Sequence, residues 1–399
     1  MYPLPRFRIS AIPLFTLAIA LIAIAPPAAA RSRKQSARRR AGPEVVAYIF
    51  PRNRVIQSGE IAARKLTRIN YAFASIQDGR IAATGPEDAP NLAALVALKK
   101  KNPSLQVLIS VGGWLGSGNF SDMALTPESR LRFIDSVVAF VERNNLDGLD
   151  IDWEYPGQIG AGNHFRAVDK TNYTLLLAEI RKRFNREERK LQQPLVLTIA
   201  AGAGDHFLDH TEMRRVARVV DTVNLMAYDY YVPGSEPITG NHAPLYTDPQ
   251  DPSHVSADAS VRHFEQAGVP PRKIVLGVPF YGHVWGHVPP ANHGLFQPGL
   301  PFPGAFAPYG NIAGSMLGHG FTRYWDASAS VPYLYNAEKE EFVSYEDPDS
   351  LALKCAYVQR MNLAGVMFWE LSSDPSGVLL DTIDRAFYGK TIHNTGDER

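Results

Sequence analysis

The sequence predicts an α/β protein built on a (β/α)8 TIM barrel, with a small α+β subdomain inserted between barrel strands seven and eight. From Glu44 onward, eight short runs of β-branched or aromatic residues alternate with stretches of helical pattern, which is typical of parallel strands joined by helices. The even spacing breaks once, where residues 280–364 separate the last two runs. A doubly wound open sheet is the alternative, because periodicity alone does not distinguish an open sheet from a closed one.

Each strand is predicted from one of these runs. The eight candidates are Val45–Phe50, Ile69–Ala74, Val107–Val111, Leu149–Glu154, Leu195–Ala200, Thr222–Tyr228, Ile274–Pro279 and Gly365–Glu370. A helix is predicted over Glu128–Arg143, because Thr126 can cap its N-terminus and Pro127 suits its first position. The apolar face of this helix is assigned to Leu131, Ile134, Val137, Val138 and Phe140. A second helix is predicted from Asn172 to Phe184.

The predicted catalytic barrel covers residues 44–388 and includes the insertion, which is placed at residues 286–355. The insertion is rich in Gly and Pro and then in aromatic residues. Those aromatic residues are Trp325, Tyr333, Tyr335, Phe342 and Tyr345. Residues 389–399 are predicted to form a polar tail.

The N-terminal 30 residues have the three parts of a secretory signal peptide. Arg6 and Arg8 precede an apolar run from Ile9 to Ala25, and Ala28–Ala30 supplies a small-residue cleavage site. A signal anchor that stays in the membrane is the alternative, since the run is near the lower length limit for spanning a bilayer. We expect cleavage after Ala30, a basic linker at 31–43, a secreted or periplasmic location, and no stable membrane insertion after cleavage.

Composition and charge exclude several classes of protein. The 399 residues are 45% hydrophobic and 20% charged, which argues against a disordered, collagen-like or coiled-coil chain. The net charge is +1, but eight of the 41 Lys and Arg residues lie in the first 40 positions. The remaining chain has 33 basic and 40 acidic residues, a net −7, which disfavours nucleic acid as a partner. The single cysteine, Cys355, excludes an internal disulfide framework and a cysteine-based zinc site.

The segment Asp147–Pro156 carries the most informative chemistry. Strand side chains alternate between faces, so Asp150, Asp152 and Glu154 share one face, whereas Leu149, Ile151 and Trp153 occupy the other. In a barrel the acidic face would line the interior and lead to the C-terminal mouth, where barrel active sites lie. Carboxylates stacked about 6.8 Å apart repel one another and must share protons or accept hydrogen bonds.

Three other interpretations compete with carboxylate catalysis. An exposed acidic strand edge conflicts with the apolar residues that alternate with the carboxylates. A calcium or magnesium site suits stacked carboxylates, but the segment lacks EF-hand spacing and a neighbouring histidine. A buried structural network is the third. Acid–base catalysis by the carboxylates is favoured over all three.

Asp147–Glu154 resembles the D-x-x-D-x-D-x-E signature of family 18 glycoside hydrolases, the chitinase family, and the match is complete. Further segments resemble elements of the same family, in the same order. They are Tyr71–Ala74, Ser110–Trp114, Leu225–Tyr230, Gly277–Gly282 and Gly365–Glu370. The resemblance covers about residues 44–388 and implies the barrel and its insertion.

The resemblance implies retaining hydrolysis at a 2-acetamido sugar, in which the substrate's own N-acetyl oxygen is the nucleophile. Glu154 would be the general acid and later the base. Asp152 would hydrogen-bond the acetamido N–H and stabilise the positive charge, and Asp150 would share a proton with Asp152. Tyr228 would hold the acetamido carbonyl oxygen. No cofactor and no metal are expected.

The same resemblance suggests the residues that bind sugar. Trp369 is the leading candidate for stacking on a sugar ring, and Asp229 for a polar contact; Trp153 is expected to pack outward in the core. The other candidates are Met226, Tyr48, Phe73, Gly113, Trp114, Tyr155, Tyr281 and Trp325. Many family members have Arg where this chain has His283, which places one substrate contact in doubt. His283, His287 and His293 are interpreted as loop residues and not as a metal site.

The expected partner is a polysaccharide or oligosaccharide with 2-acetamido sugars, bound by a monomer. Chitin is favoured as the substrate, and peptidoglycan or N-glycan core sugars are the alternatives within the same fold. A chitin-binding lectin is the alternative of another class. The lectins that resemble this family lack the acidic residue at the position of Glu154, so the presence of Glu154 favours an enzyme.

Overall fold

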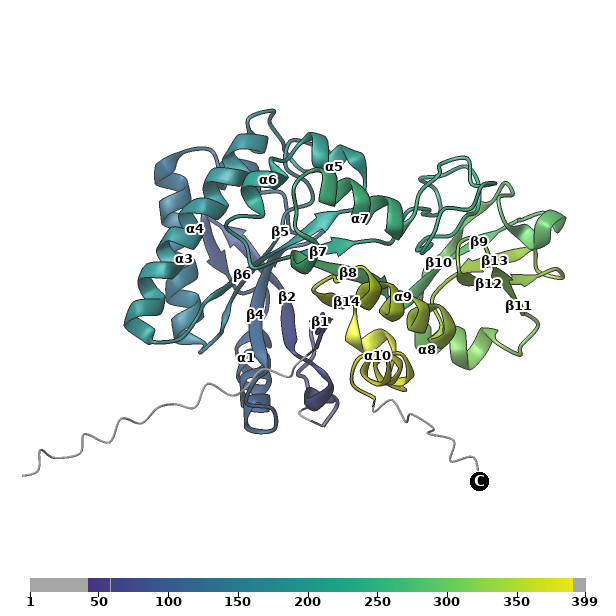
Figure 1. Cartoon of the computed structure of the whole chain (residues 1–399), viewed down its shortest axis with the longest axis horizontal. Helices are drawn as coiled ribbons and strands as arrows, with labels where there is room; N and C mark the ends of the chain where they lie inside the picture. Colours follow the sequence, from purple (N-terminus) through teal and green to yellow (C-terminus); the bar gives the residue numbers. More distant parts are fainter. Residues whose placement is uncertain (1–41, 58, 390–399) are drawn as a thin grey trace, which may run out of the picture. The chain divides into compact units, whose positions relative to one another are not determined.

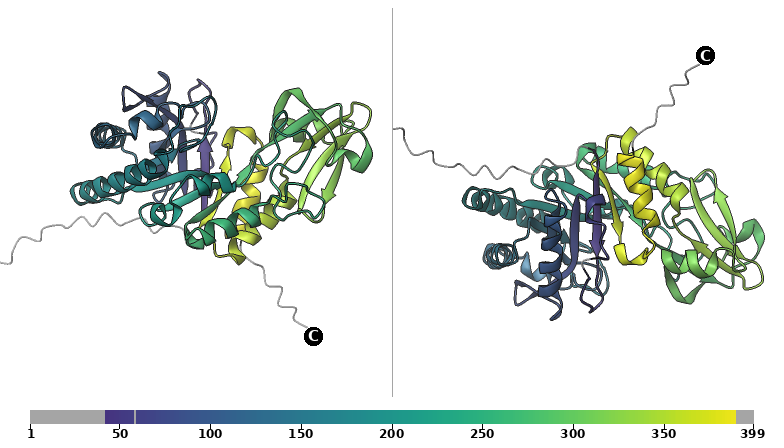
Figure 2. Two further views of the ribbon diagram at one scale, coloured as in Figure 1. Left: turned by 90° about the horizontal axis from the view of Figure 1, so that it is seen from above. Right: turned by 90° about the horizontal axis from the view of Figure 1, so that it is seen from below.

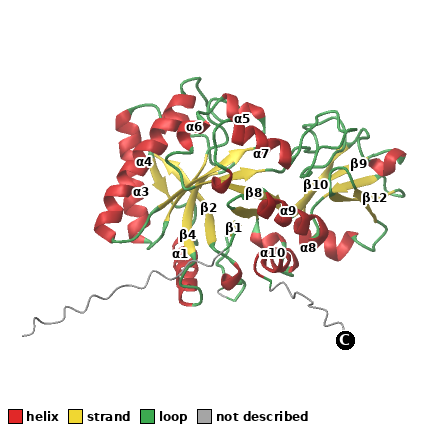
Figure 3. Cartoon of the chain, viewed as in Figure 1, coloured by secondary structure: helices red, strands yellow, loops and turns green. Residues whose placement is uncertain are grey.

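A computed structural model describes residues 42–57 and 59–389 of the chain. The predicted signal peptide, all but the end of the linker, and residues 390–399 of the tail lie outside these ranges. Eight parallel strands in the described part close into a barrel, because β1 (Glu44–Ile49) pairs in parallel with both β14 (Gly365–Trp369) and β2 (Arg68–Gln77). The closed barrel is confirmed over the open sheet, and helices surround its strands (Figures 1 and 3).

All eight predicted strands are present, in the predicted order. The other barrel strands are β4 (Gln106–Gly112), β5 (Gly148–Asp152), β6 (Val196–Gly202), β7 (Thr222–Met226) and β8 (Ile274–Pro279). A short β3 (Arg80–Ala82) pairs antiparallel with β2. Strand β5 ends two residues earlier than predicted, so Glu154 lies just beyond the strand and not within it.

The helices of the described residues are α1 (Asp88–Ala97), α2 (Phe120–Met123), α3 (Pro127–Arg143), α4 (Asp169–Leu191), α5 (Asp205–Asp209), α6 (Met213–Val216), α7 (Ala257–Gln266), α8 (Tyr309–Asn311), α9 (Pro348–Arg360) and α10 (Val378–Tyr388). The predicted helix 172–184 is therefore extended at both ends. Among the described residues, no helix combines the length and apolar character that crossing a bilayer requires.

Helix α3 begins with the predicted cap. Thr126 accepts a hydrogen bond from the backbone N–H of Ser129, and Ser129 accepts one from that of Thr126. One residue of the predicted apolar face is misplaced, because Leu131 is 54% exposed. The neighbouring Arg130 is buried instead and forms two hydrogen bonds of 2.9 Å with Glu179 of α4. Leu131 therefore lies at the flank of the buried face.

Replacing Thr126 by alanine should reduce the free energy of unfolding by about 1 kcal/mol, the usual effect of removing an N-cap side chain. Urea unfolding curves of the two proteins would measure the difference. Thr126→Ser keeps the hydroxyl and should stay close to wild type. Equal losses in both variants would contradict a role for the cap.

Strand β5 has one polar and one apolar face, as predicted. Leu149, Ile151 and Trp153 are buried on the outer side of the barrel. Trp153 is 1% exposed and stacks on Phe120 with ring centroids 5.0 Å apart. The outward face thus packs against the surrounding helices and leaves the inward face for the carboxylates.

Residues between β8 and β14 form a second, antiparallel sheet of five strands in the order β10-β9-β13-β12-β11. These strands are β9 (Tyr281–Gly286), β10 (Leu300–Pro308), β11 (Thr322–Asp326), β12 (Val331–Asn336) and β13 (Glu341–Ser344). The sheet begins five positions before the predicted start of the insertion, because only Phe280 separates β8 from β9. Helix α9, which overlaps the predicted end of the insertion, lies beside α10 (Figure 2).

Candidate active site

Strand β5 places two aspartates inside the barrel. Asp150 is fully buried and Asp152 is 4% exposed. In the parallel register, Asp150 is level with Ser110 of β4 and Thr198 of β6. The acidic face is therefore surrounded by side chains from neighbouring strands, as expected for the interior of a barrel.

Asp150 accepts four hydrogen bonds from other strands. Its Oδ2 accepts from Tyr48 Oη at 2.9 Å and Ser110 Oγ at 2.7 Å. Its Oδ1 accepts from Thr198 Oγ1 at 2.5 Å and Asn224 Nδ2 at 3.1 Å. Two oxygens with four donors match a carboxylate better than a carboxylic acid, which would itself have to donate.

The expected bond between Asp150 and Asp152 is not formed in this structure. Both oxygens of Asp150 are taken by the four donors, and Asp152 Oδ1 is buried with no hydrogen-bond partner among the described residues. Burial, followed by the negative charges of Glu154 and Asp150, raises the pKa of Asp152 well above its usual value. Burial and the neighbouring carboxylates thus disfavour the charged form of Asp152, whose Oδ1 has no donor to stabilise a negative charge.

Glu154 extends from the end of β5 on a well-held backbone. Its N–H donates to Ser117 Oγ at 2.9 Å, and its carbonyl oxygen accepts from Asn163 Nδ2 at 2.7 Å. Burial raises the pKa of the Glu154 carboxyl to about 7, the charge of Asp229 adds to the rise, and a hydrogen bond with Tyr155 opposes it. A carboxyl group that titrates near neutral pH can serve both as acid and as base.

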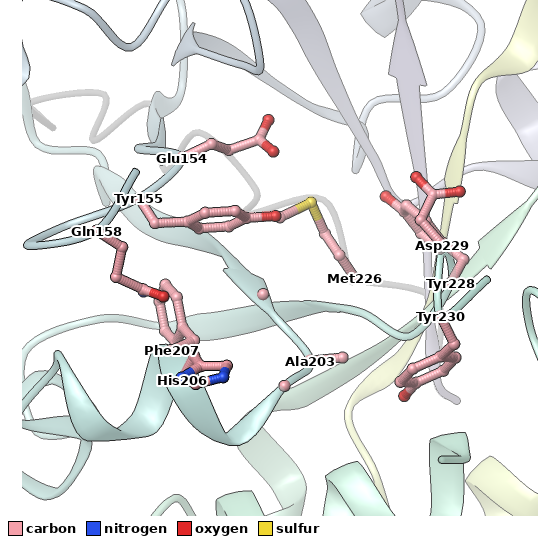
Figure 4. A pocket seen from close by; sticks show the side chains of 12 residues that line it. Glu154, Tyr155, Gln158, Ala203, His206, Phe207, Met226, Tyr228, Asp229 and Tyr230 are labelled. Carbon is pink, nitrogen blue, oxygen red and sulfur yellow. The ribbon is translucent and has the colours of Figure 1, made fainter. Parts of the chain in front are cut away.

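A cavity of about 310 Å³ opens at Glu154. Four of the predicted residues line it beside Glu154: Tyr155, Met226, Tyr228 and Asp229. In Figure 4, Glu154 and Tyr155 lie on one side, Tyr228 and Asp229 lie on the other, and Met226 extends between them. Burial, followed by the charges of Asp229, Asp152 and Glu154, raises the pKa of Tyr228 well above its usual value, so this phenol remains a hydrogen-bond donor.

Sequence reasoning missed several residues of the cavity wall. They are Gln158, Gly202, Ala203, Gly204, His206, Phe207 and Tyr230. Gly202 is the last residue of β6 and residues 203–207 follow it directly, at the edge of the barrel where β5 and β7 also end. The position of the strand ends could therefore have identified them.

The predicted stacking residue Trp369 belongs to an aromatic cluster formed by side chains of β1, β2 and β14 and by Phe50, the residue after β1. Its ring stacks on Phe73, with centroids 5.5 Å apart, and on Phe50 at 5.9 Å, and Tyr48 is 6.0 Å away. Gly113 is required beside this cluster, because its φ is +78° and a Cβ would lie 2.6 Å from the Phe73 ring. Trp369 does not line the cavity at Glu154.

The two other predicted tryptophans are placed differently. Trp114 is 51% exposed, and its ring lies 6.5 Å from that of Tyr155, which lines the cavity.

The structure does not bring Trp325 to the site. Trp325 pairs with Pro332, whereas Tyr324 is in line with Tyr333. Tyr333 is in register with Ser344, and Ser344 with His283, which shares a sheet face with Tyr281. Strand alternation therefore puts Trp325 on the opposite face, where it lies 5.2 Å from the Arg323 guanidinium.

Asp229 follows β7 with a φ of 59°, a conformation that aspartate tolerates better than most residues. Its Oδ1 accepts from Tyr281 Oη at 2.6 Å and lies 2.8 Å from His283 Nε2. Burial opposes ionisation of Asp229, but the neighbouring His242 and His283 outweigh burial and hold its pKa well below the usual value. Asp229 is therefore a fixed negative charge on the cavity wall.

His283 lies in β9 and not in a loop, contrary to the sequence interpretation.

Comparison with known proteins agrees with this geometry. Residues 44–374 match the protein family described as "Glycosyl hydrolases family 18". The chain belongs to that family. The family 18 match covers the barrel strands, the second sheet and every residue of the site.

Named relatives point the same way. Chitinase A1 of Niallia circulans is 40% identical over 73% of this chain and 44% of its own length. Chitinase B of Serratia marcescens is 32% identical over 82% of this chain and 77% of its own length. The chain thus spans less than half of the first relative. A solved family 18 N-acetylglucosaminidase from Paenibacillus barengoltzii is 41% identical over 86% of this chain and 99% of its own, with a TM-score of 0.79. Family membership and these relatives support a glycoside hydrolase of chitinase type.

Proposed function

We propose that this protein is a retaining glycoside hydrolase that cleaves β-1,4-linked N-acetylglucosamine in chitin by substrate-assisted catalysis. The observation that carries the proposal is Glu154, whose pKa is raised to about 7 and which lines a cavity opposite Tyr228 and Asp229. Asp152, whose pKa burial and the neighbouring carboxylates raise, lies two residues before it at the end of β5. These groups can supply a proton, a hydrogen-bond acceptor and a fixed negative charge to one sugar.

In the first step, protonated Glu154 donates its proton to the glycosidic oxygen. The bond from the anomeric carbon to that oxygen breaks, and the acetamido oxygen bonds to the anomeric carbon to give an oxazolinium ion. Tyr228 holds the acetamido oxygen by a hydrogen bond. Asp152 accepts a hydrogen bond from the acetamido N–H, which requires it to lose its proton or to present its carbonyl oxygen.

In the second step, the Glu154 carboxylate takes a proton from water. The resulting hydroxide attacks the anomeric carbon, the oxazolinium ring opens, and the acetamido group is restored. Because both displacements occur at the same carbon, the product keeps the β-configuration. Glu154 is again protonated at the end of the cycle.

The mechanism requires an N-acetyl group on the sugar at the cleaved bond. Chitin oligosaccharides should be hydrolysed, whereas chitosan oligosaccharides, which lack the acetyl group, should be cleaved at least about 100 times more slowly, in line with the contribution of a well-placed reacting group. Product analysis on chitin oligosaccharides, peptidoglycan and a high-mannose glycopeptide would identify the substrate class. Equal rates on acetylated and deacetylated oligomers would contradict substrate assistance.

Activity should fall as pH rises through about 7. The pKa of Glu154 is raised to about 7, so its carboxyl is protonated and able to donate below that pH and is ionised above it. The value of kcat/KM on soluble chitin oligosaccharides should lose about tenfold for each further pH unit on the alkaline side. An activity that stays constant up to about pH 9 would contradict Glu154 as the general acid.

Export and a monomeric state belong to the same proposal. Residues 1–30 have the composition of a signal peptide. N-terminal sequencing of the exported protein should begin at Arg31. Retention of residues 1–30 would favour the membrane anchor instead.

A further inference from the structure

A carboxylate and two imidazoles meet on the cavity wall. Donor atoms of Asp229, His242 and His283 all lie within 4.8 Å of one another. Within residues 42–57 and 59–389 this is the one group of three His, Cys, Asp or Glu side chains with such spacing. The three residues come from the end of β7, the loop that follows it, and β9, so no sequence motif links them.

Their spacing is close to that of ligands around one metal ion. Zinc binds nitrogen at about 2.0–2.1 Å and oxygen at similar distances, and a tetrahedral site therefore separates two ligand atoms by about 3.3 Å. Asp229 Oδ1 lies 2.8 Å from His283 Nε2 and 3.6 Å from His242 Nδ1. Small side-chain rotations would bring both nitrogens to the same ion.

His242 is a buried polar side chain whose ring forms no hydrogen bond of good geometry, although its Nδ1 lies 3.6 Å from Asp229 Oδ1. It is fully buried, and neither of its ring nitrogens has a hydrogen-bond partner among the described residues. Leaving a buried polar group without a hydrogen bond is destabilising, so a ligand that accepts or binds it is favoured. The backbone of His242 is fixed, because its N–H donates to Ser344 Oγ of β13 at 2.9 Å and its carbonyl accepts from the Tyr230 N–H at 3.1 Å. The imidazole is thus held in place beside Asp229.

Asp229 leaves the proposed site open toward the cavity. Its side chain is 43% exposed and lines the cavity, which leaves room for water or another ligand in a fourth position.

We propose that Asp229, His242 and His283 form a binding site for a divalent transition-metal ion such as Zn²⁺, and that the bound ion competes with the sugar for Asp229. Two imidazoles and one carboxylate favour zinc, copper or nickel over calcium and magnesium, which prefer oxygen ligands. The competition rests on the proposed function, because Asp229 is also a candidate sugar contact. The ion is therefore an inhibitor and not a cofactor.

The first experiment measures binding without substrate. Isothermal titration of the full, chelator-treated chain with Zn²⁺ should give one site per chain, and Mg²⁺ should give none. His242→Ala and His283→Ala should each weaken Zn²⁺ binding by at least about 100-fold, since losing even an outer partner of a ligand costs about 10–100-fold. His287→Ala removes an exposed histidine next to β9 and is the matched control, expected to bind like wild type.

A spectroscopic measurement separates loss of a ligand from loss of fold. Co²⁺ in place of Zn²⁺ should give visible absorption bands of a low-coordinate site, and X-ray absorption of the Zn²⁺ form should show two imidazole ligands. Absence of Zn²⁺ binding at millimolar concentration would overturn the site. Binding that survives both His242→Ala and His283→Ala would also overturn it, because the ion would then lie elsewhere.

The second experiment tests competition. A chitin oligosaccharide should raise the apparent Kd for Zn²⁺, and Zn²⁺ should inhibit hydrolysis in a way that a chelator reverses. Zn²⁺ binding without any hydrolysis of chitin would refute the proposed function and leave the metal site standing. Hydrolysis without Zn²⁺ binding would do the reverse, and binding of both without mutual effect would refute the competition.

Discussion

Replacing Glu154 by glutamine should reduce kcat on chitin oligosaccharides by about 1,000-fold or more, because one carboxyl performs both proton transfers of the cycle and each contributes about 10²–10⁴-fold. Glutamine has nearly the same shape but neither donates nor accepts the transferred proton. The backbone bonds of Glu154 to Ser117 and Asn163 do not involve its side chain, so the local structure should persist. Initial rates from product chromatography would measure the effect.

Binding should survive the same substitution. The affinity of Glu154→Gln for a chitin oligosaccharide, measured by titration calorimetry, should stay within about threefold of wild type, because the loss falls on the transition state and not on the ground state. Glu142→Gln is a suitable control, since Glu142 is exposed near the end of α3 on the outside of the barrel. Rates above a tenth of wild type in Glu154→Gln would exclude this residue as the acid.

Much of the fold could be predicted because its signals are local. Alternation along β5 is visible in the sequence alone and separates Asp150 and Asp152 from Trp153, and the eight strand runs alternate with helical stretches. Leu131 was misassigned because helical periodicity identifies a buried face but not its edges. The start of the second sheet was missed because β9 continues almost directly from β8, with no turn signal between them.

The site residues that lie on one continuous segment could be predicted from the sequence. Those that come together from distant segments could not. Glu154 follows from the alternation along one strand, and Tyr228 and Asp229 follow from the resemblance of Leu225–Tyr230 to a family 18 motif. The partners of Asp150, by contrast, depend on the register of strands that lie far apart in sequence, and His242 comes from a loop without periodicity. Trp325 shows the same limit, since a single-residue difference in position decides which face of a strand a side chain occupies.

The four donors around Asp150 suggest that this residue supports the barrel as well as the chemistry. Asn224 donates to both Asp150 and Tyr48, and accepts a hydrogen bond from Arg68 at 3.0 Å. Arg68 is 1% exposed and pairs with Glu44 at 2.9 Å. The positive charge of Arg68 partly offsets the effect of burial on the pKa of Asp150, which is nevertheless raised. Removing the carboxylate would leave donors from four strands without an acceptor.

Asp150→Leu should therefore lower the free energy of unfolding by at least about 3 kcal/mol, since each stranded buried donor costs about 1–3 kcal/mol and hydroxyls can reorient to recover only some of the loss. Asp150→Asn retains one acceptor oxygen at similar volume and should lose about half as much. Urea midpoints at constant m-value would measure both. Asp150→Asn should also shift the pH dependence of kcat, because a neutral amide no longer adds its negative charge to the effect of burial in raising the pKa of Asp152. If Asp150→Leu were as stable as wild type, the hydrogen bonds to Asp150 would not stabilise the barrel. The role of Asp150 would then be limited to catalysis.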